Sequence, residues 1–194
     1  MPAAKQILRS CSLAIAWLCA GCVTAHHDPA PAAAPRKAAS PDLQRAIEAF
    51  SGTWAITEQY PPGANFPKGG SGKGSEDWRS ATDGLGLIYE YRSVNPNGEI
   101  RAMAVLWWDT SKKALQELWC VNGDPSGCVL SAARIYWEGS DLVFIETYET
   151  RGHRMYSREV WSDIKPSSHT MTISEGEVPN DLHPWIISRA TRVK

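Results

Sequence analysis

Two cysteines, Cys120 and Cys128, flank a turn-rich segment at 122–127 and carry the most readily assigned chemistry in the sequence. Such thiols could ligate a metal, act as a redox pair or form a disulfide. Structural zinc sites pair cysteines two to four residues apart and need a second pair, and redox sites use Cys-x-x-Cys. Neither pattern occurs after residue 25. Because a hairpin brings facing strand ends together, we predict a Cys120–Cys128 disulfide formed in an oxidising compartment.

Two further segments resemble catalytic motifs without completing them. The glycine-rich segment 68–75 approaches the phosphate-binding pattern G-x-x-x-x-G-K-[ST], but Gly74 follows Lys73 where that motif needs Ser or Thr. We interpret the segment as a flexible loop between the first two strands. Ser162 and Lys165 match Ser-x-x-Lys, but the partner motifs of that enzyme class are missing from the sequence. We therefore predict no catalytic residues and no enzymatic activity.

Charged and imidazole side chains form no recognisable site either. Strand alternation and the usual exposure of charged residues place most of the glutamates in predicted strands on the solvent face. These glutamates are Glu90, Glu146, Glu149 and Glu159. His26 and His27 lie in a Pro/Ala tract, where a lone pair binds metal weakly and nonspecifically. We predict no metal site, and the formal net charge of -1 gives no reason to expect nucleic-acid binding.

The N-terminus has the features of a secretory signal. Lys5 and Arg9 precede an apolar run at 13–20, which is shorter than the roughly 20 residues that a membrane-spanning helix needs. Two processing sites compete. Small residues before Cys22 resemble the lipobox of bacterial lipoproteins, in which that cysteine is acylated, whereas the Val-Thr-Ala sequence at 23–25 fits ordinary cleavage.

These features define the expected domain organisation and location. We predict a signal peptide over 1–25, a Pro/Ala-rich linker over 26–41 and a single domain over 42–194. Acylation of Cys22 would anchor the domain to a membrane as a periplasm-facing lipoprotein of the bacterial cell envelope. Ordinary cleavage would instead release a secreted protein.

The domain reads as one short helix followed by an all-β region. Ser40 can cap a helix that begins at Pro41 and ends near Ser51. Beyond it, short polar turns separate segments rich in Val, Ile, Tyr and Trp, which favours antiparallel neighbours. We expect strands at 53–60, 76–81, 85–94, 99–109, 114–121, 128–137, 141–150, 154–163, 168–175 and 185–193. About ten such strands predict an up-and-down antiparallel β-barrel, with a β-sandwich as the alternative.

Three short motifs carry a family resemblance. The helix running into Gly52-x-Trp54, the Gly-Leu-Gly-Leu-Ile sequence at 84–88 and the closing Arg189-Ala-Thr-Arg192 resemble a bacterial family of lipocalin-like (calycin-type) barrel domains of unknown function. In lipocalins the tryptophan of Gly-x-Trp lies at the closed end of the barrel under an arginine of the last strand. The resemblance therefore implies a structural role for Trp54, covered by Arg189 or Arg192 in a cation–π contact.

A related resemblance raises haem as an alternative cofactor. Nitrobindin-like haem proteins also open with Gly-x-Trp, and here Tyr60-Pro61 follows it as in that family. Haem would need an axial ligand, for which His183, just before the last strand, is the candidate. His153 and His169 read as turn or edge residues. The favoured prediction nevertheless has no cofactor.

Nine tryptophans and six tyrosines suit either a packed core or a pocket for an apolar ligand. Alternation groups Leu87 with Tyr89 and Tyr91, Ala104 with Leu106 and Trp108, and Leu115 with Glu117 and Trp119, but it does not tell which faces are interior. If these faces are interior, the candidate ligand-binding residues are Tyr89, Tyr91, Trp108 and Trp119. We predict an exported, lipid-anchored barrel that binds a small apolar or aromatic ligand. The alternative is an envelope interaction or structural module with a self-filled barrel.

Overall fold

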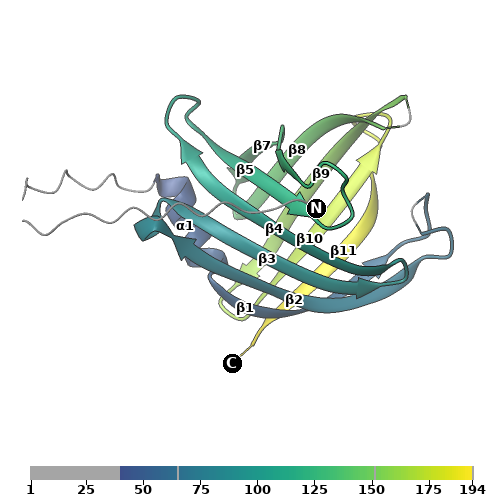
Figure 1. The fold of residues 1–194 in the computed structure, drawn as a ribbon, viewed down its shortest axis with the longest axis horizontal. Helices are drawn as coiled ribbons and strands as arrows, with labels where there is room; N and C mark the ends of the chain where they lie inside the picture. The colour runs from purple at the N-terminus through teal and green to yellow at the C-terminus, as the bar shows by residue number, and fades with distance from the viewer. Residues whose placement is uncertain (1–39, 65, 151, 194) are drawn as a thin grey trace, which may run out of the picture. The chain divides into compact units, whose positions relative to one another are not determined.

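The computed structural model describes residues 40–64, 66–150 and 152–193, which form one helix, one short 3₁₀ turn and eleven strands. The helix is α1 (Pro41–Phe50) and the 3₁₀ turn is η1 (Thr82–Gly84) (Figure 1). The strands are β1 (Gly52–Tyr60), β2 (Gly70–Ala81), β3 (Gly86–Asn95), β4 (Gly98–Asp109), β5 (Ala114–Val121), β6 (Cys128–Leu130), β7 (Arg134–Glu138), β8 (Asp141–Thr150), β9 (His153–Lys165), β10 (Ser168–Gly176) and β11 (His183–Arg192).

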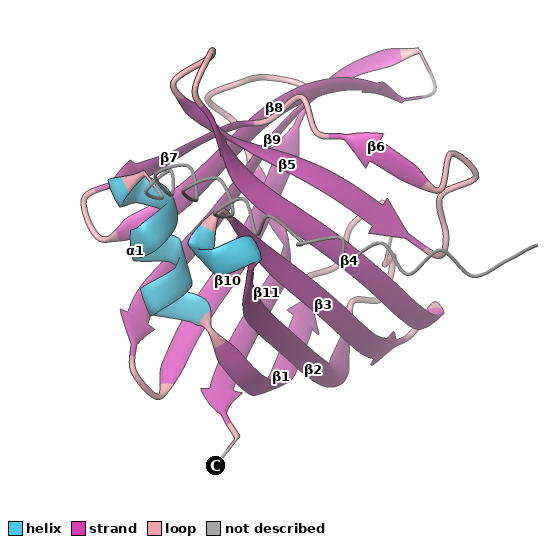
Figure 2. Ribbon diagram, turned by 60° about the vertical axis from the view of Figure 1, so that its left-hand side comes forward, coloured by secondary structure: helices cyan, strands magenta, loops and turns pink. Residues whose placement is uncertain are grey.

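The strands close into an antiparallel barrel, which confirms the predicted fold class. Ten strands pair in the order β4-β3-β2-β1-β11-β10-β9-β8-β7-β5, and pairing of β4 with β5 joins the two ends of this sheet. The short β6 pairs with β5 alone and lies outside the ring (Figure 2). Closure leaves the ring without the unpaired edges that invite aggregation. The predicted strand at 128–137 is two strands in the structure, β6 and β7.

The glycine-rich segment is a strand and not the flexible loop expected from its composition. Residues 70–75 form the first half of β2 and pair with β1 on one side, and from Lys73 onward with β3 on the other. A Cβ atom at Gly72 would lie 2.6 Å from a carboxylate oxygen of Glu58, and one at Gly74 would collide with the backbone of Arg92. These glycines are therefore required by close approach of neighbouring groups.

Helix α1 covers one end of the barrel. The Ser40 hydroxyl accepts a hydrogen bond from the Leu43 amide at 3.1 Å, and Pro41 occupies the first helical position. The buried face of the helix presents Phe50 to the interior, where its ring stacks on Trp78 at 5.0 Å and meets Trp161 edge-on at 5.3 Å. The helix is thus held by aromatic packing rather than by propensity alone.

Trp54 lies at this closed end, under an arginine of the last strand. Its indole nitrogen donates to the Phe50 carbonyl at 2.8 Å, and the guanidinium carbon of Arg192 lies 4.0 Å from its ring centroid. Arg192 also donates to the carbonyls of Ser51 and Pro166, at 2.6 Å each. Arg189, the other candidate, is exposed. Arg192 therefore joins the end of the last strand to the start of the first.

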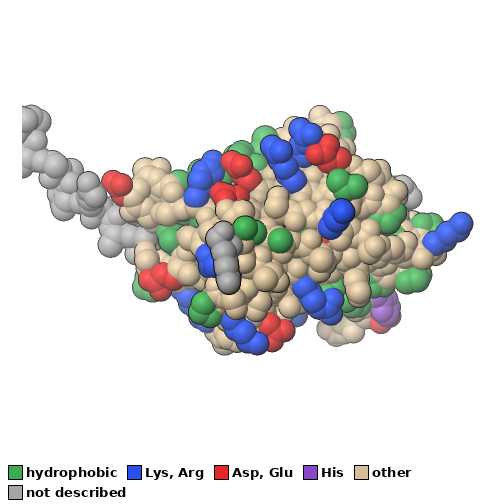
Figure 3. All heavy atoms as spheres, turned by 90° about the horizontal axis from the view of Figure 1, so that it is seen from below, with side chains coloured by type: hydrophobic (Ala, Val, Ile, Leu, Met, Phe, Trp, Pro, Cys, Tyr) green, Lys and Arg blue, Asp and Glu red, His purple; other side chains and the backbone are tan. Residues whose placement is uncertain are grey.

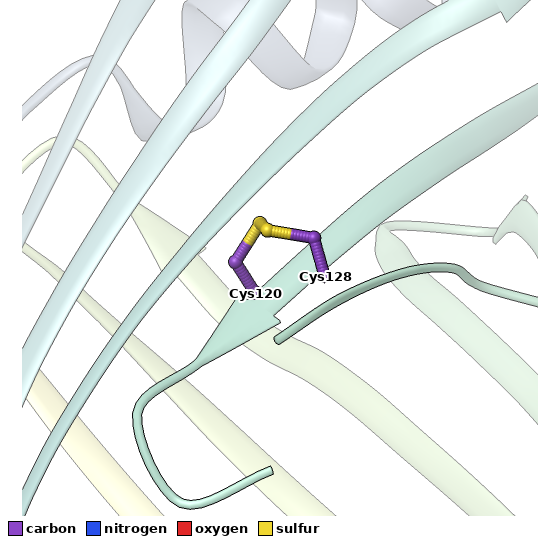
Figure 4. The surroundings of a disulfide bond; sticks show 2 residues. All are labelled: Cys120 and Cys128. Carbon is purple, nitrogen blue, oxygen red and sulfur yellow. A yellow bond between two sulfur atoms is a disulfide. The ribbon is translucent and has the colours of Figure 1, made fainter. Parts of the chain in front are cut away.

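The disulfide predicted from the sequence is confirmed. Cys120 and Cys128 are directly opposed in the β5–β6 pair with their Cα atoms 4.1 Å apart, and the bond joins β6 to the end of β5 (Figure 4). Within the described ranges, no helix has the length and apolar character needed to cross a bilayer.

Replacing Arg192 by Met tests its role in closing the barrel. The change removes a cation–π contact and leaves two backbone carbonyls without their donor, so we expect the free energy of unfolding to fall by about 2–3 kcal/mol. Arg189→Met on the same strand is the matched control, and we expect a change within about 0.5 kcal/mol because that side chain is exposed. Urea denaturation followed by tryptophan fluorescence measures both. Equal effects of the two substitutions would contradict the assignment.

The disulfide closes a small loop, and its removal has a bounded effect on stability. For a sequence separation of 8 residues the chain-entropy relation predicts a loss of about 2–3 kcal/mol in the Cys120→Ser/Cys128→Ser variant. Urea denaturation with and without reductant checks this value. The double variant should resist any further effect of reductant, whereas the unmodified protein should lose stability to a similar extent. If reductant does not change the free energy of unfolding of the unmodified protein, the disulfide makes no measurable contribution to stability.

Candidate ligand-binding site

Strand register decides which side chains face the barrel interior. Tyr89 pairs with Trp78 on one neighbouring strand and with Ala104 on the other, and Ala104 in turn pairs with Trp119. The three faces that alternation had left unassigned therefore all turn inward. Because inward and outward positions alternate along each strand, the same register assigns every other position of these strands.

The interior is packed at the α1 end and less completely buried towards the other end. Next to α1 the inward side chains are buried, as for Leu87 at 0% and Trp161 at 2% exposure. Towards the opposite end the inward side chains of β5, β8, β9 and β10 keep intermediate exposure, whereas Tyr60, Ser93 and Asn95 on β1 and β3 are buried. We call this partly exposed part the lumen and define it by Glu117, Trp119, Glu146, Tyr148, Ser157, Glu159, Ile173 and Glu175.

Carboxylates inside the barrel are the feature that sequence reasoning missed. Glu90 and Glu149 face solvent as predicted, but the outward placement of Glu146 and Glu159 was wrong. Their register partners, Ser157 and Phe144, lie with them on the inner face. Alternation tells which residues share a face of the sheet but not which face is inside. The exposure typical of glutamate then led to the wrong choice between the two faces. The inward position of Glu117, between Leu115 and Trp119, was the signal that could have revealed the pattern.

Glu58 lies in the wall of the barrel at 1% exposure with its carboxylate fully engaged. It accepts hydrogen bonds from the hydroxyls of Tyr60 at 2.6 Å and Tyr91 at 2.5 Å, and from that of Ser93. Burial, followed by the hydrogen bond to Glu58, raises the pKa of Tyr60 to about 12 and that of Tyr91 further. Three hydroxyl donors explain how a buried carboxylate is tolerated at this position.

Glu76 and His169 form a buried pair at the α1 end of the barrel. His169 Nε2 lies 3.0 Å from a Glu76 oxygen that also accepts from the Trp78 indole at 3.2 Å. The rings of Trp54, Trp161 and Phe50 surround the imidazole at centroid distances of 4.5, 5.3 and 5.4 Å. His169 is therefore a core residue and not the turn or edge residue expected. Among the described residues, the second oxygen of Glu76 and Nδ1 of His169 have no hydrogen-bond partner.

Three further carboxyls act on one another across the lumen. Burial, followed by repulsion from Glu159 and Glu146, raises the pKa of Glu117 to about 8, against a weaker opposing hydrogen bond from Ser131. Burial is also the main cause that raises the pKa of Glu159 to about 7, although its carboxylate accepts from the Trp161 indole at 2.5 Å. Glu117 and Glu159 therefore resist joint ionisation near neutral pH, because both are like charges in a partly buried space.

Glu175 and Tyr148 form a fourth polar contact in the lumen. The Tyr148 hydroxyl donates to the Glu175 carboxylate at 2.8 Å. Burial is the first cause that raises the pKa of each group, and the hydrogen bond adds to the rise for Tyr148 and opposes it for Glu175. The lumen therefore has an acidic and aromatic lining along β5, β8, β9 and β10.

The predicted ligand-binding residues separate into two groups. Tyr89, at 6% exposure, has its ring 6.4 Å from that of Trp119 and 6.1 Å from that of Tyr91. Of these three, Trp119 is the one that keeps intermediate exposure to the lumen, while Tyr91 is committed to Glu58. Trp108 pairs with Leu115 near α1, away from this group. The structure thus brings together three of the four residues.

Other predicted residues lie away from the lumen or outside the described ranges. The side chain of His183 is 77% exposed and lies 3.3 Å from an Asp181 oxygen, a position that gives haem ligation no support. Cys22, His26 and His27 fall outside the described residues. In the part of the chain that the structure describes, no three His, Cys, Asp or Glu side chains are close enough together to hold a metal ion.

The structure places the chain in the class of closed antiparallel ten-stranded β-barrels with a helix-covered end. No protein-family model matches the sequence, and no curated protein is significantly similar to it. Among solved structures the chain is similar to Rv2717c from M. tuberculosis, with a TM-score of 0.51 and 11% identity over 81% of this chain and 100% of that one. Such a likeness shows the fold alone, so the resemblance to the bacterial lipocalin-like family stays a prediction.

The lumen carboxyls predict an unusual pH dependence of stability. Folding raises the pKa of Glu117 and Glu159 above the ordinary 4.5, so the stability that their protonated forms provide is fully present below about pH 4.5 and is lost as the pH rises through about 7 and 8. We expect the free energy of unfolding to fall by roughly 2–5 kcal/mol between about pH 5 and pH 9. Urea denaturation across this range measures it.

Isosteric variants identify the groups responsible. Glu117→Gln and Glu159→Gln should each flatten the decline and stabilise the protein at about pH 9, because a neutral amide avoids the cost of ionisation. Glu149→Gln on the outer face should keep the unmodified profile. A profile unchanged in both lumen variants would show that other groups determine it.

Proposed function

We propose that this protein is an exported binding barrel that holds a small molecule with an apolar or aromatic body in its lumen. The observation that carries the proposal is the unequal burial of the interior: buried rings close the α1 end, while Trp119, which the register places inside, is only partly buried. A large indole left partly exposed inside a barrel is unsatisfied apolar surface, and a ligand of matching shape would cover it.

The surroundings of Trp119 suit a flat ligand. The Trp119 ring is nearly parallel to that of Tyr89, with an interplanar angle of 23°. Between them, the register partner of Trp119 on β4 is the small residue Ala104. Small residues beside large rings leave space that larger side chains would fill. This arrangement supports binding more than it supports the alternative of a self-filled barrel.

Catalysis is less well supported than binding. The buried His169–Glu76 pair is the arrangement closest to an acid–base pair, but aromatic rings surround the imidazole at the closed end. A substrate would have to displace that packing to reach it. The lumen glutamates keep partial exposure, and Ser157 lies opposite Glu146 on the inner face, but among the described residues no inward lysine or arginine lies beside them.

Export and anchoring are part of the proposal. The Cys120–Cys128 disulfide supports an oxidising compartment such as the bacterial periplasm. The signal-like N-terminus and the lipobox resemblance at Cys22 support a lipid-anchored form, with the Pro/Ala tract as a spacer between membrane and barrel. In this arrangement the barrel would capture its ligand at the envelope.

A neutral fluorescent probe tests lumen binding. N-phenyl-1-naphthylamine gains fluorescence when it enters an apolar site, and we expect saturable binding to the purified protein. Trp119→Ala should weaken that binding on the order of tenfold, because removing a wall indole loses about 1–3 kcal/mol of contact.

Trp107→Ala provides the matched control. Trp107 lies on the same sheet, but its register partner Gln116 puts it on the outer face. We expect this variant to bind the probe as the unmodified protein does. Binding that is absent from the unmodified protein, or equally sensitive to both substitutions, would reject the lumen as the site.

A further inference from the structure

The charge of the lumen narrows the class of ligand, an argument that rests on the proposed function. Six glutamates from six strands point into the barrel: Glu58, Glu76, Glu117, Glu146, Glu159 and Glu175. Among the described strand positions that the register places inside, none is a lysine, and the arginine found there, Arg192, lies over Trp54 at the closed end. The remaining basic group of the interior, His169, is committed to Glu76.

The outer surface shows no such bias. On the face drawn in Figure 3, acidic and basic side chains are interspersed. The outward glutamates Glu90, Glu99 and Glu138 each have an arginine within 2.9 Å. The excess of acid is therefore a property of the interior, where burial makes unpaired charge costly, and not of the whole barrel.

Several interior carboxylate oxygens lack donors. Glu58 has three hydroxyl partners, but one oxygen of Glu76, a residue 1% exposed, is buried without a hydrogen bond. Glu159 has the Trp161 indole as its donor, and among the described residues no hydrogen bond is made by the Glu146 side chain. Buried acceptors in native proteins are normally satisfied, so the buried Glu76 oxygen calls for a donor that the described residues do not supply, and the partly exposed Glu146 carboxylate can accept one from a ligand.

Aromatic rings stand beside these acids. Trp119 and Tyr89 face the same interior as Glu117, and Trp161 donates its indole hydrogen to Glu159. Ring faces attract cations, and carboxylates attract them more strongly. The acids are nevertheless too dispersed for a metal ion, since no three potential ligands among the described residues converge. A larger cation, whose charge is spread over an organic group, fits this spacing better.

We infer that the lumen ligand is an organic cation, either a protonated amine or a quaternary ammonium, attached to an apolar or aromatic body. The body covers Trp119, and the cationic group lies between Glu117, Glu146 and Glu159. A neutral ligand would leave these acids without a counter-charge, and an anion would be repelled by them.

Binding of such a cation is coupled to protons. Glu117 faces Glu159 and Glu146, with Ser131 as its hydrogen-bond donor. Glu159 faces Glu76 and Glu146, with Trp161 as its donor. In the free protein their raised pKa values keep these acids largely protonated below about pH 7. A cation favours the ionised form, so binding releases protons, and the affinity rises with pH.

Two probes of equal shape and unequal charge test the inference. The [4-(hydroxymethyl)phenyl]trimethylammonium ion and 4-tert-butylbenzyl alcohol differ only in a nitrogen for a carbon, and neither probe titrates near neutral pH. Competition with N-phenyl-1-naphthylamine gives both dissociation constants. We expect the ammonium ion to bind at least tenfold more tightly than the alcohol at about pH 8.5, and this ratio to shrink towards pH 5.5. Equal binding, or tighter binding of the alcohol, at the higher pH would overturn the inference.

Charge-neutralising variants locate the cation. Glu117→Gln and Glu159→Gln should reduce the preference for the ammonium ion over the alcohol severalfold, a ratio that cancels any change common to both probes, and their urea denaturation curves show that the variants fold. Glu149→Gln, on the outside of β8, should leave this preference as it is in the unmodified protein. An equal loss of preference in Glu149→Gln would assign the effect to general surface charge and would reject the site.

The outcome separates this inference from the proposed function. If the naphthylamine binds and the ammonium ion has no advantage, the barrel binds ligands but is not selective for cations. If the naphthylamine does not bind, calorimetry with the ammonium ion measures its affinity directly, and repeating it in buffers of different ionisation enthalpy counts the released protons. Absence of ammonium binding there would reject both.

Discussion

Aromatic packing at the α1 end is the interaction on which the rest of this structure depends. Phe50 stacks on Trp78 and meets Trp161, while Trp54 contacts both Arg192 and the His169 ring. Each buried ring contributes about 1.5–3 kcal/mol by removing apolar surface from water. Because this packing concentrates apolar burial at one end, the interior beyond it is less completely buried along β5, β8, β9 and β10 and can include groups that a filled core would exclude.

Carboxyls lie inside the barrel, where an ionised group is costly, and they differ in how many hydrogen-bond donors stabilise them. Glu58 has three hydroxyl donors, so its burial is balanced within the protein. Glu117 and Glu159 are not balanced in this way, and their raised pKa values reflect burial and mutual repulsion. Groups with perturbed pKa values cluster at functional sites. The acids and the partly buried Trp119 together are therefore the basis of the proposed binding site.

Much of the fold was predictable because its local chemistry is explicit. Ser40 and Pro41 predict the start of the helix. Short polar turns separate strands whose β-branched and aromatic residues alternate. The errors have equally local causes. Glycine content suggested a loop at 70–75, where close approach of Glu58 and the β3 backbone in fact requires glycine in a strand. The predicted strand at 128–137 did not reveal that β6 leaves the ring before β7 begins.

The sequence by itself determined the all-β class, the disulfide and which residues share a face, because turn chemistry, cysteine count and a period of two are local properties. Only the tertiary structure decided which face is inside. Closure through β4 and β5 curves the sheet in one sense, and that curvature turned Glu146 and Glu159 inward with Trp119. The same register put Arg192 over Trp54 and left Arg189 in solvent. A local pattern cannot supply this choice, since the direction of curvature arises from contacts between strands far apart in the chain.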